Sequence, residues 1–198
     1  MGQVIISLSR EYGSGGHDIG VEIAKRYGFD FYDHSMLDNI ARESGMDVDA
    51  IKNIEKKDVP LLSGILKGGN PQEENVVRIQ TDYLNDLVEA GRSMVVVGRC
   101  SEYIFRDQDC LISIFISGDL DKRIERIMNK YKISKEEAEH KVARHDKSRA
   151  DYHNRYTKST WGYAGVYDYC VNSSKLGFDA TVDLVCDYID KRIAVMNK

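Results

Sequence analysis

The first 27 residues constrain the fold more than any other part of this sequence. Residues 3–8, QVIISL, are short, apolar and rich in β-branched side chains, which is typical of a buried strand. A glycine-rich segment, SREYGSGGHDIG, follows at 9–20, and residues 18–27 then have the apolar spacing of an amphipathic helix. A strand, a glycine turn and a helix in this order open a βαβ unit and favour an α/β fold.

The rest of the chain alternates apolar strand-like runs with helical ones. We expect further strands at 29–32, 94–97, 110–116 and 167–171, and further helices at 35–44, 74–90, 117–130, 134–156 and 179–195. Near-continuous apolar strands separated by helices predict three layers, with a parallel, mostly five-stranded sheet between helices. The intervening stretch at 45–75 is polar and contains glycines and prolines, so we expect an insertion outside the core.

Length and charge exclude several classes of protein. A chain of 198 residues suits a single α/β domain with an inserted lobe. A net charge of −4 is no signature of nucleic-acid binding. No apolar run approaches the roughly 20 residues that span a bilayer. Because the N-terminus leads straight into a strand-like segment, we expect no signal peptide. The four cysteines have no metal-ligand spacing, so we expect a cytoplasmic protein without a metal site built from its own side chains.

The glycine turn is the best candidate for a binding site. In open parallel sheets, ligands bind beyond the carboxyl ends of the strands, and this rule brings residues 9–17, 33–34, 98–99 and 117–118 to one edge. Glycines in such a turn let backbone N–H groups approach an anion, and the following helix adds its partial positive charge. A turn that binds nothing is the alternative interpretation.

The turn departs from the usual phosphate-binding motif, G-x-x-x-x-G-K-[ST]. If Gly15 is the last glycine of that motif, Gly16 stands in the place of the lysine; if Gly16 is, His17 stands there. No serine or threonine stands where the motif has its Mg²⁺ ligand. Arg10, a protonated His17 or an arginine from a later segment could supply the missing positive charge.

A second candidate lies in a basic stretch near residues 140–158. It contains Lys141, Arg144, Lys147, Arg149, Arg155 and Lys158, together with His140, His145 and His153. This surplus of positive charge favours an anionic ligand, whereas the alternative is a solvated helix face. The histidines lack the HExxH spacing of a metal site, so we interpret them as solvated surface residues.

These motifs together resemble those of the cytidylate kinase-like family of P-loop proteins. The resemblance depends on SREYGSGG after an apolar strand, FYD at 31–33, VGR at 97–99 and the basic stretch at 144–155. It covers essentially the whole chain and implies one P-loop kinase domain. The core would comprise 1–35, 91–130 and 165–198, with a helical insertion for a nucleoside monophosphate at 36–90 and a helical lid at 131–160.

The resemblance also implies an activity, namely phosphoryl transfer from ATP, with Mg²⁺, to a small nucleotide such as CMP. The donor phosphates would be held by residues of the turn: Ser9, Arg10, Gly13, Ser14, Gly15, Gly16, His17 and Asp18. The acceptor would meet Asp33, His34 and Arg99. The charge of the transferring group would be neutralised by arginines, since one planar guanidinium can bind two phosphate oxygens at once. The candidates are Arg10, Arg99, Arg144, Arg149 and Arg155.

The missing lysine keeps other functions open. One is a nucleotide-binding or regulatory protein without catalysis, and another is a kinase for a small molecule that is not a nucleotide. The insertion at 45–75 would decide the acceptor and could mediate homodimerisation, but its sequence identifies neither.

Overall fold

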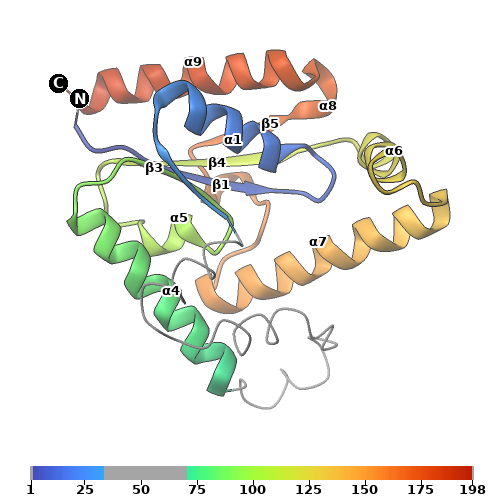
Figure 1. Ribbon diagram of the computed structural model, residues 1–198, viewed down its shortest axis with the longest axis horizontal. Helices are drawn as coiled ribbons and strands as arrows, with labels where there is room; N and C mark the ends of the chain where they lie inside the picture. The colour runs from blue at the N-terminus through green and yellow to red at the C-terminus, as the bar shows by residue number, and fades with distance from the viewer. Residues whose placement is uncertain (1, 34–70, 198) are drawn as a thin grey trace. The chain divides into compact units, whose positions relative to one another are not determined.

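The computed structural model describes residues 2–33 and 71–197 of the chain (Figure 1). It forms two compact units, one of Met1–Phe31 with Ser93–Lys198 and one of Tyr32–Arg92. The described elements are, in chain order, β1 (Ile5–Arg10), α1 (Gly16–Tyr27), β2 (Asp30–Tyr32), α4 (Pro71–Glu89), β3 (Met94–Val97), α5 (Ser101–Ile104), β4 (Leu111–Ser117), α6 (Leu120–Tyr131), α7 (Lys135–Thr157), the 3-10 turn η2 (Ala164–Val166), β5 (Tyr169–Asn172), α8 (Ser173–Leu176) and α9 (Phe178–Met196).

The sheet has five strands in the order β2-β3-β1-β4-β5, and β1 lies at its centre. Strand β1 pairs in parallel with β3, where Ile5 lies opposite Met94, and with β4, where Ile5 lies opposite Leu111. Strand β4 pairs in parallel with β5. The chain therefore has the predicted α/β fold with a parallel, five-stranded sheet, and the carboxyl ends of β1, β3 and β4 meet at one edge.

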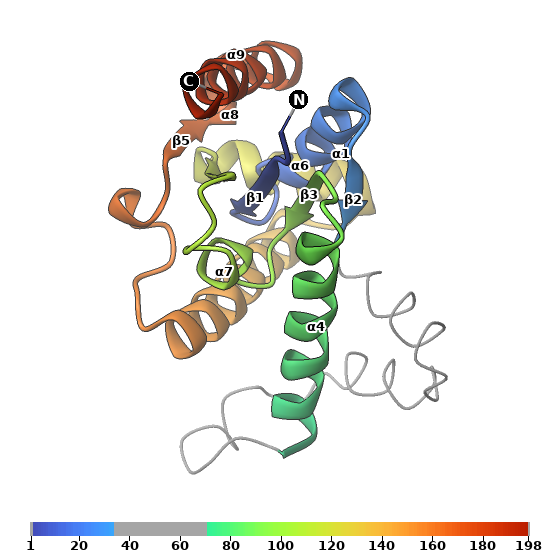
Figure 2. The same cartoon turned by 90° about the vertical axis from the view of Figure 1, so that its left-hand side faces the viewer.

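Alternation along β1 gives the two faces of the sheet different chemistry. Ile6 and Leu8 are completely buried in the main apolar cluster, with side chains of α1 and α9. Ser7 and Ser9 therefore point to the opposite face, because neighbouring strand residues alternate. Figures 1 and 2 show α1 and α9 on one side of the sheet and α5 and α7 on the other.

The segment predicted as a lid, 131–160, consists mainly of helix α7, which packs against the preceding helix α6. Helix α7 begins with a capping box, in which the Ser134 hydroxyl accepts from the Glu137 amide and the Glu137 carboxylate accepts from the Ser134 amide. The two helices pack through a small apolar cluster that includes Ile127 and Val142. This packing places the inward face of α7 beside the glycine turn, as its hydrogen bonds show below.

Two short helices, α5 and α8, were not predicted, because four residues are too few to show a helical repeat. Helix α4 of the second unit ends as expected before Gly91, whose φ of 70° and bond to the Val88 carbonyl stop the helix. The predicted helix at 35–44 and most of the insertion at 45–75 lie outside the described residues. No helix among the described residues is long and apolar enough to cross a membrane.

Candidate phosphate-binding site

The turn between β1 and α1 has the backbone shape that its glycines predict. Gly13 and Gly15 have φ values of 83° and 82°, in the left-handed region that residues with a Cβ rarely adopt. Gly15 is the N-cap of α1, and the helix begins at Gly16. This start fits the alignment in which Gly15 is the last glycine of the motif and Gly16 stands in the place of the lysine.

Neighbouring atoms leave no room for a side chain at Gly13 or at Gly16. A Cβ on Gly13 would lie 2.8 Å from the backbone oxygen of Arg123, and a Cβ on Gly16 would lie 2.6 Å from the Cβ of Arg10. Glycine at position 16 is thus required by packing against β1. The geometry of the turn therefore leaves no space for a lysine at this position.

Two backbone N–H groups of the turn are available for a ligand. The amides of Gly13 and Gly15 donate to no acceptor in the described parts of the chain. The Ser14 hydroxyl, by contrast, is used within the turn, since it donates to the Glu11 carbonyl at 2.8 Å. Unpaired amides at the positive end of a helix form a binding site for an anion such as phosphate.

Arg10 and Arg126 lie directly against the turn. The guanidinium of Arg10 lies against Gly98, and its Cβ packs on Gly16, so the side chain crosses from β1 toward the end of β3. The guanidinium of Arg126 lies over Gly15 and is exposed. Arg126 makes no hydrogen bond or ion pair with the residues that the structure describes, which leaves its charge available to an anion.

Arg126 was not among the predicted residues, because the candidate arginines came from the glycine turn, the end of the strand at 94–97 and the later basic stretch, and not from the helix at 117–130. The signal that could have found it is the position of α6, which follows β4, the strand next to β1. The first turns of such a helix begin at the same edge of the sheet as the glycine turn.

Ser9, His17 and Asp18, the other predicted residues of the turn, differ in their burial and in their hydrogen-bond partners. The Ser9 hydroxyl donates to the Glu102 carboxylate at 3.4 Å, on the buried side of β1. His17 lies at the start of α1, and its Nδ1 is 3.3 Å from the Asp18 carboxylate, which is largely exposed. The backbone of Ser9 and the side chains of His17 and Asp18 thus border the turn.

A charged network ties helix α7 to the turn. The Asp146 carboxylate accepts from the Tyr12 amide at 2.7 Å and from the Arg123 guanidinium at 2.5 Å. Arg123 is buried, and it also donates to the carbonyl oxygens of Gly118 and Tyr12. Since Glu11 accepts from the Gly118 amide at 2.8 Å, this network joins β1, the start of α6 and α7.

Arg149 and His145 extend this contact. Arg149 donates to the backbone oxygen of Arg10 at 2.9 Å, and burial lowers the pKa of its guanidinium. The His145 ring stacks on the Tyr12 ring with 4.2 Å between centroids. Burial, followed by the nearby charges of Lys141, Arg149 and Arg144, lowers the pKa of His145 to about 4. The Asp146 carboxylate acts in the opposite direction, and His145 is neutral at pH 7.

The remaining predicted arginines differ in exposure. Arg144 is exposed on α7, whereas Arg155 is half-buried and lies over the Tyr156 ring at 5.6 Å. Arg99 follows β3 with a φ of 62°, which is unusual for a residue with a side chain. Asp33 is buried and belongs to the second unit, and His34 lies outside the described residues.

One prediction about the histidines is wrong. We expected solvated surface residues, but His153 is 3% exposed, because it points from α7 toward the sheet. Among the residues that the structure describes, no three His, Cys, Asp or Glu side chains gather as a metal site.

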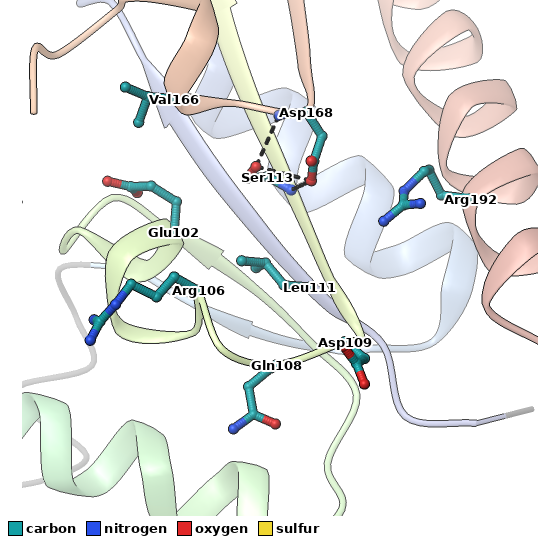
Figure 3. A pocket seen from close by; sticks show the side chains of 9 residues that line it. All are labelled: Glu102, Arg106, Gln108, Asp109, Leu111, Ser113, Val166, Asp168 and Arg192. Carbon is teal, nitrogen blue, oxygen red and sulfur yellow. Dashed lines mark hydrogen bonds between the residues drawn. The ribbon is translucent and has the colours of Figure 1, made fainter.

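A polar cavity of about 360 Å³ lies elsewhere in the first unit, toward the amino end of β4. Figure 3 shows its lining, which includes Arg192 of α9, Asp109 before β4 and Glu102 of α5. The Asp168 carboxylate on its wall accepts from the amide and hydroxyl of Ser113. Because β4 runs away from this cavity toward the glycine turn, the cavity is distinct from the phosphate site.

The fold and the glycine turn together define a P-loop kinase fold. The family model of the cytidylate kinase-like family matches residues 5–175, so the chain belongs to that family. The family model thus confirms the resemblance seen in the sequence. No match was found among curated proteins.

Solved structures agree with this fold. A protein from Eubacterium ventriosum ATCC 27560, described as uncharacterized, is 31% identical with a TM-score of 0.76, covering 95% of this chain and 99% of that one. Shikimate kinase from Bacteroides thetaiotaomicron is 13% identical with a TM-score of 0.56, covering 94% and 98%. Shikimate kinase from Acinetobacter baumannii, solved with shikimate, is 17% identical with a TM-score of 0.52, covering 99% and 95%. At these low identities, the shikimate kinases show the fold alone.

Proposed function

We propose that this protein transfers a phosphoryl group from ATP to a small acceptor, namely a nucleoside monophosphate such as CMP. The main support is the pair of open amides at Gly13 and Gly15, at the head of α1 and beside the exposed Arg126 guanidinium. A chain of the cytidylate kinase-like family with such a turn has the parts that a donor phosphate needs.

The proposed chemistry is positioning and charge neutralisation, which dominate phosphoryl transfer. The backbone of the turn holds the donor phosphates. Arg126, whose guanidinium lies over Gly15, supplies the positive charge of the missing lysine. Arg10 of β1 and the α7 residues Arg144 and Arg155 neutralise further charge on the transferring group. Arg99 binds the acceptor phosphate. Arg149 holds the Arg10 carbonyl, so its role in this proposal is to fix the turn.

The described residues provide no evident Mg²⁺ site at the turn. His17 stands where the motif has a hydroxyl ligand, and the Ser14 hydroxyl is bonded to the Glu11 carbonyl. We therefore propose that Mg²⁺ enters with ATP, held by its phosphates and by water, as this ion commonly is. A cytoplasmic location, a nucleotide partner and a homodimer all stay predictions.

A non-catalytic nucleotide-binding protein is the second candidate. It is favoured by the glycine at position 16, since losing a preorganised charge contact in the transition state costs about 3–4 kcal/mol in other enzymes. An enzyme lacking the lysine must replace that contact, whereas a sensor need not.

A coupled assay of ADP formation with the purified chain separates the two. We expect ADP to form with ATP, Mg²⁺ and CMP, and we expect Arg126→Ala to slow the reaction at least about 100-fold, within the range for one transition-state contact. Lys122→Ala, an exposed residue on the same helix, is the matched control. ATP binding without ADP formation, over a panel of nucleoside monophosphates and shikimate, would support the non-catalytic protein instead. Failure to bind ATP would reject both.

A further inference from the structure

A buried polar cluster lies beneath the turn that carries Arg99. Glu102 of α5 and His153 of α7 are 5% and 3% exposed, and their Oε1 and Nε2 atoms lie 2.8 Å apart. The contact is a close approach rather than a well-aligned hydrogen bond, and neither atom has a hydrogen-bond partner elsewhere among the described residues. Buried ionisable groups are costly unless they are paired, so each of these two side chains depends on the other. Neither residue was among the site residues predicted from the sequence.

The cluster is bound to the central strand. The second oxygen of Glu102 accepts from the hydroxyls of Ser7 and Ser9, each at 3.4 Å. The hydroxyls of Ser7 and Ser101 are 2.6 Å apart. Two serines on the same face of a buried strand would weaken an apolar core, and here they instead fix the first residues of α5 against β1.

The backbone just before α5 is strained. Gly98, Arg99 and Cys100 have φ values of 82°, 62° and 54°, so three consecutive residues are left-handed. Such a conformation is unfavourable for residues with a Cβ and persists only where the surroundings determine it. Ser101 and Glu102 follow directly, and their buried side-chain bonds hold this turn against β1 together with the bond from the Gly98 amide to the Leu8 carbonyl.

The other side of the cluster is the helix that contacts the glycine turn. His153 comes four residues after Arg149 and seven after Asp146, so all three share one face of α7. Arg149 and Asp146 bond to the backbone of Arg10 and Tyr12, respectively. His153 is thus a further point at which this face is attached, and it reaches α5.

We propose that Glu102 and His153 are positioning residues that couple helix α7 to the turn carrying Arg99. When α7 is docked on the phosphate turn, His153 holds Glu102, and Glu102 holds the strained turn that aims Arg99 at the acceptor. The inference rests on the proposed function for the role of Arg99, but the coupling itself is a property of the free protein.

Hydrogen exchange on the whole chain tests the coupling without any substrate. Glu102→Gln and His153→Gln keep the size of each side chain and remove its ability to be charged. We expect each variant to speed amide exchange about tenfold or more in both segments, 98–104 and 150–157. Each substitution lies in only one of these segments, so faster exchange in the other one reports the coupling. The double variant should add little to either single one. His140→Gln, an exposed residue on the same helix, is the control.

Faster exchange only around the substituted residue would overturn the proposal, as would additive effects in the double variant. If these variants do not fold, Ser7→Ala is a milder change that removes one hydroxyl from Glu102. It should raise exchange at both segments by a smaller factor, and no change at 150–157 would count against the coupling.

Kinetics then tests the link to the acceptor. With CMP as acceptor, Glu102→Gln and His153→Gln should raise the KM for CMP several-fold and leave the KM for ATP within about twofold. An equal rise in both values would indicate a general loss of structure and contradict the proposal. Absence of turnover with every acceptor of the panel in the unaltered chain would refute the proposed function, whereas the exchange experiment would still decide the coupling.

Discussion

Substitution of Gly13 by alanine separates the shape of the glycine turn from its chemistry. Gly13 has a φ of 83°, and a Cβ there would lie 2.8 Å from the Arg123 backbone oxygen, which cannot move away as a side-chain end could. The left-handed backbone alone costs about 1–2 kcal/mol. In a chain of this length each kcal/mol lowers Tm by about 2–4 °C. We therefore expect Gly13→Ala to lower the free energy of unfolding by at least about 1–2 kcal/mol. We also expect it to weaken ATP binding at least about tenfold, a change of about 1.4 kcal/mol in binding free energy.

Gly28→Ala is the matched control. Gly28 has a φ of 66° at the other end of α1, and nothing lies within 4 Å of where its Cβ would be. This variant should lose about 1–2 kcal/mol of stability for the same backbone reason, with ATP affinity unchanged. Calorimetric titration with ATP and thermal unfolding of both variants measure the two effects. Equal ATP affinity in Gly13→Ala and Gly28→Ala would refute the assignment of this turn to phosphate binding.

Three further outcomes follow from contacts of the turn. Gly16→Lys should weaken ATP binding, because its Cβ would meet the Cβ of Arg10 at 2.6 Å; tighter binding in a titration would contradict this packing argument. The pKa of His145 is about 4, below its ordinary 6.5, so the folded protein binds fewer protons than the unfolded one between these values. Stability should therefore fall as the pH drops from 6.5 to 4, and His145→Phe, which keeps the ring, should remove this part of the slope in denaturant unfolding. Asp146→Asn should destabilise the protein by up to about 3 kcal/mol, because the buried Arg123 guanidinium then keeps only the Glu11 carboxylate, 3.5 Å away, as a charged partner among the described residues; an unchanged midpoint in urea would argue against this network.

The sequence predicted the fold well because its signals are local. Strand β1, the glycine turn and α1 lie within 27 residues, and the apolar runs of β3 and β4 can be identified without knowing their neighbours. The prediction of the family depended on short motifs of this kind, and the family model confirms it.

The site was harder to predict because its contacts join distant residues. The sequence offered Arg149 as a phosphate clamp, whereas its bond to the Arg10 carbonyl spans 139 positions. Arg126 lies over Gly15 because α6 follows β4, and His153 is buried beside Glu102, which lies 51 positions earlier in the chain on α5. Spacing along a helix shows which residues share a face, but it does not show what that face meets.

The central claim is that the turn binds phosphate through its backbone without a lysine. The most direct measurement is the ¹H–¹⁵N spectrum of the protein titrated with ATP and Mg²⁺. The account predicts saturable downfield shifts of the Gly13 and Gly15 amides, since both would donate to phosphate oxygens, and a rise in the pKa of His145 as the anion offsets the surrounding positive charge. A spectrum in which ATP leaves these two amides unshifted, or shifts only residues away from the turn, would contradict it.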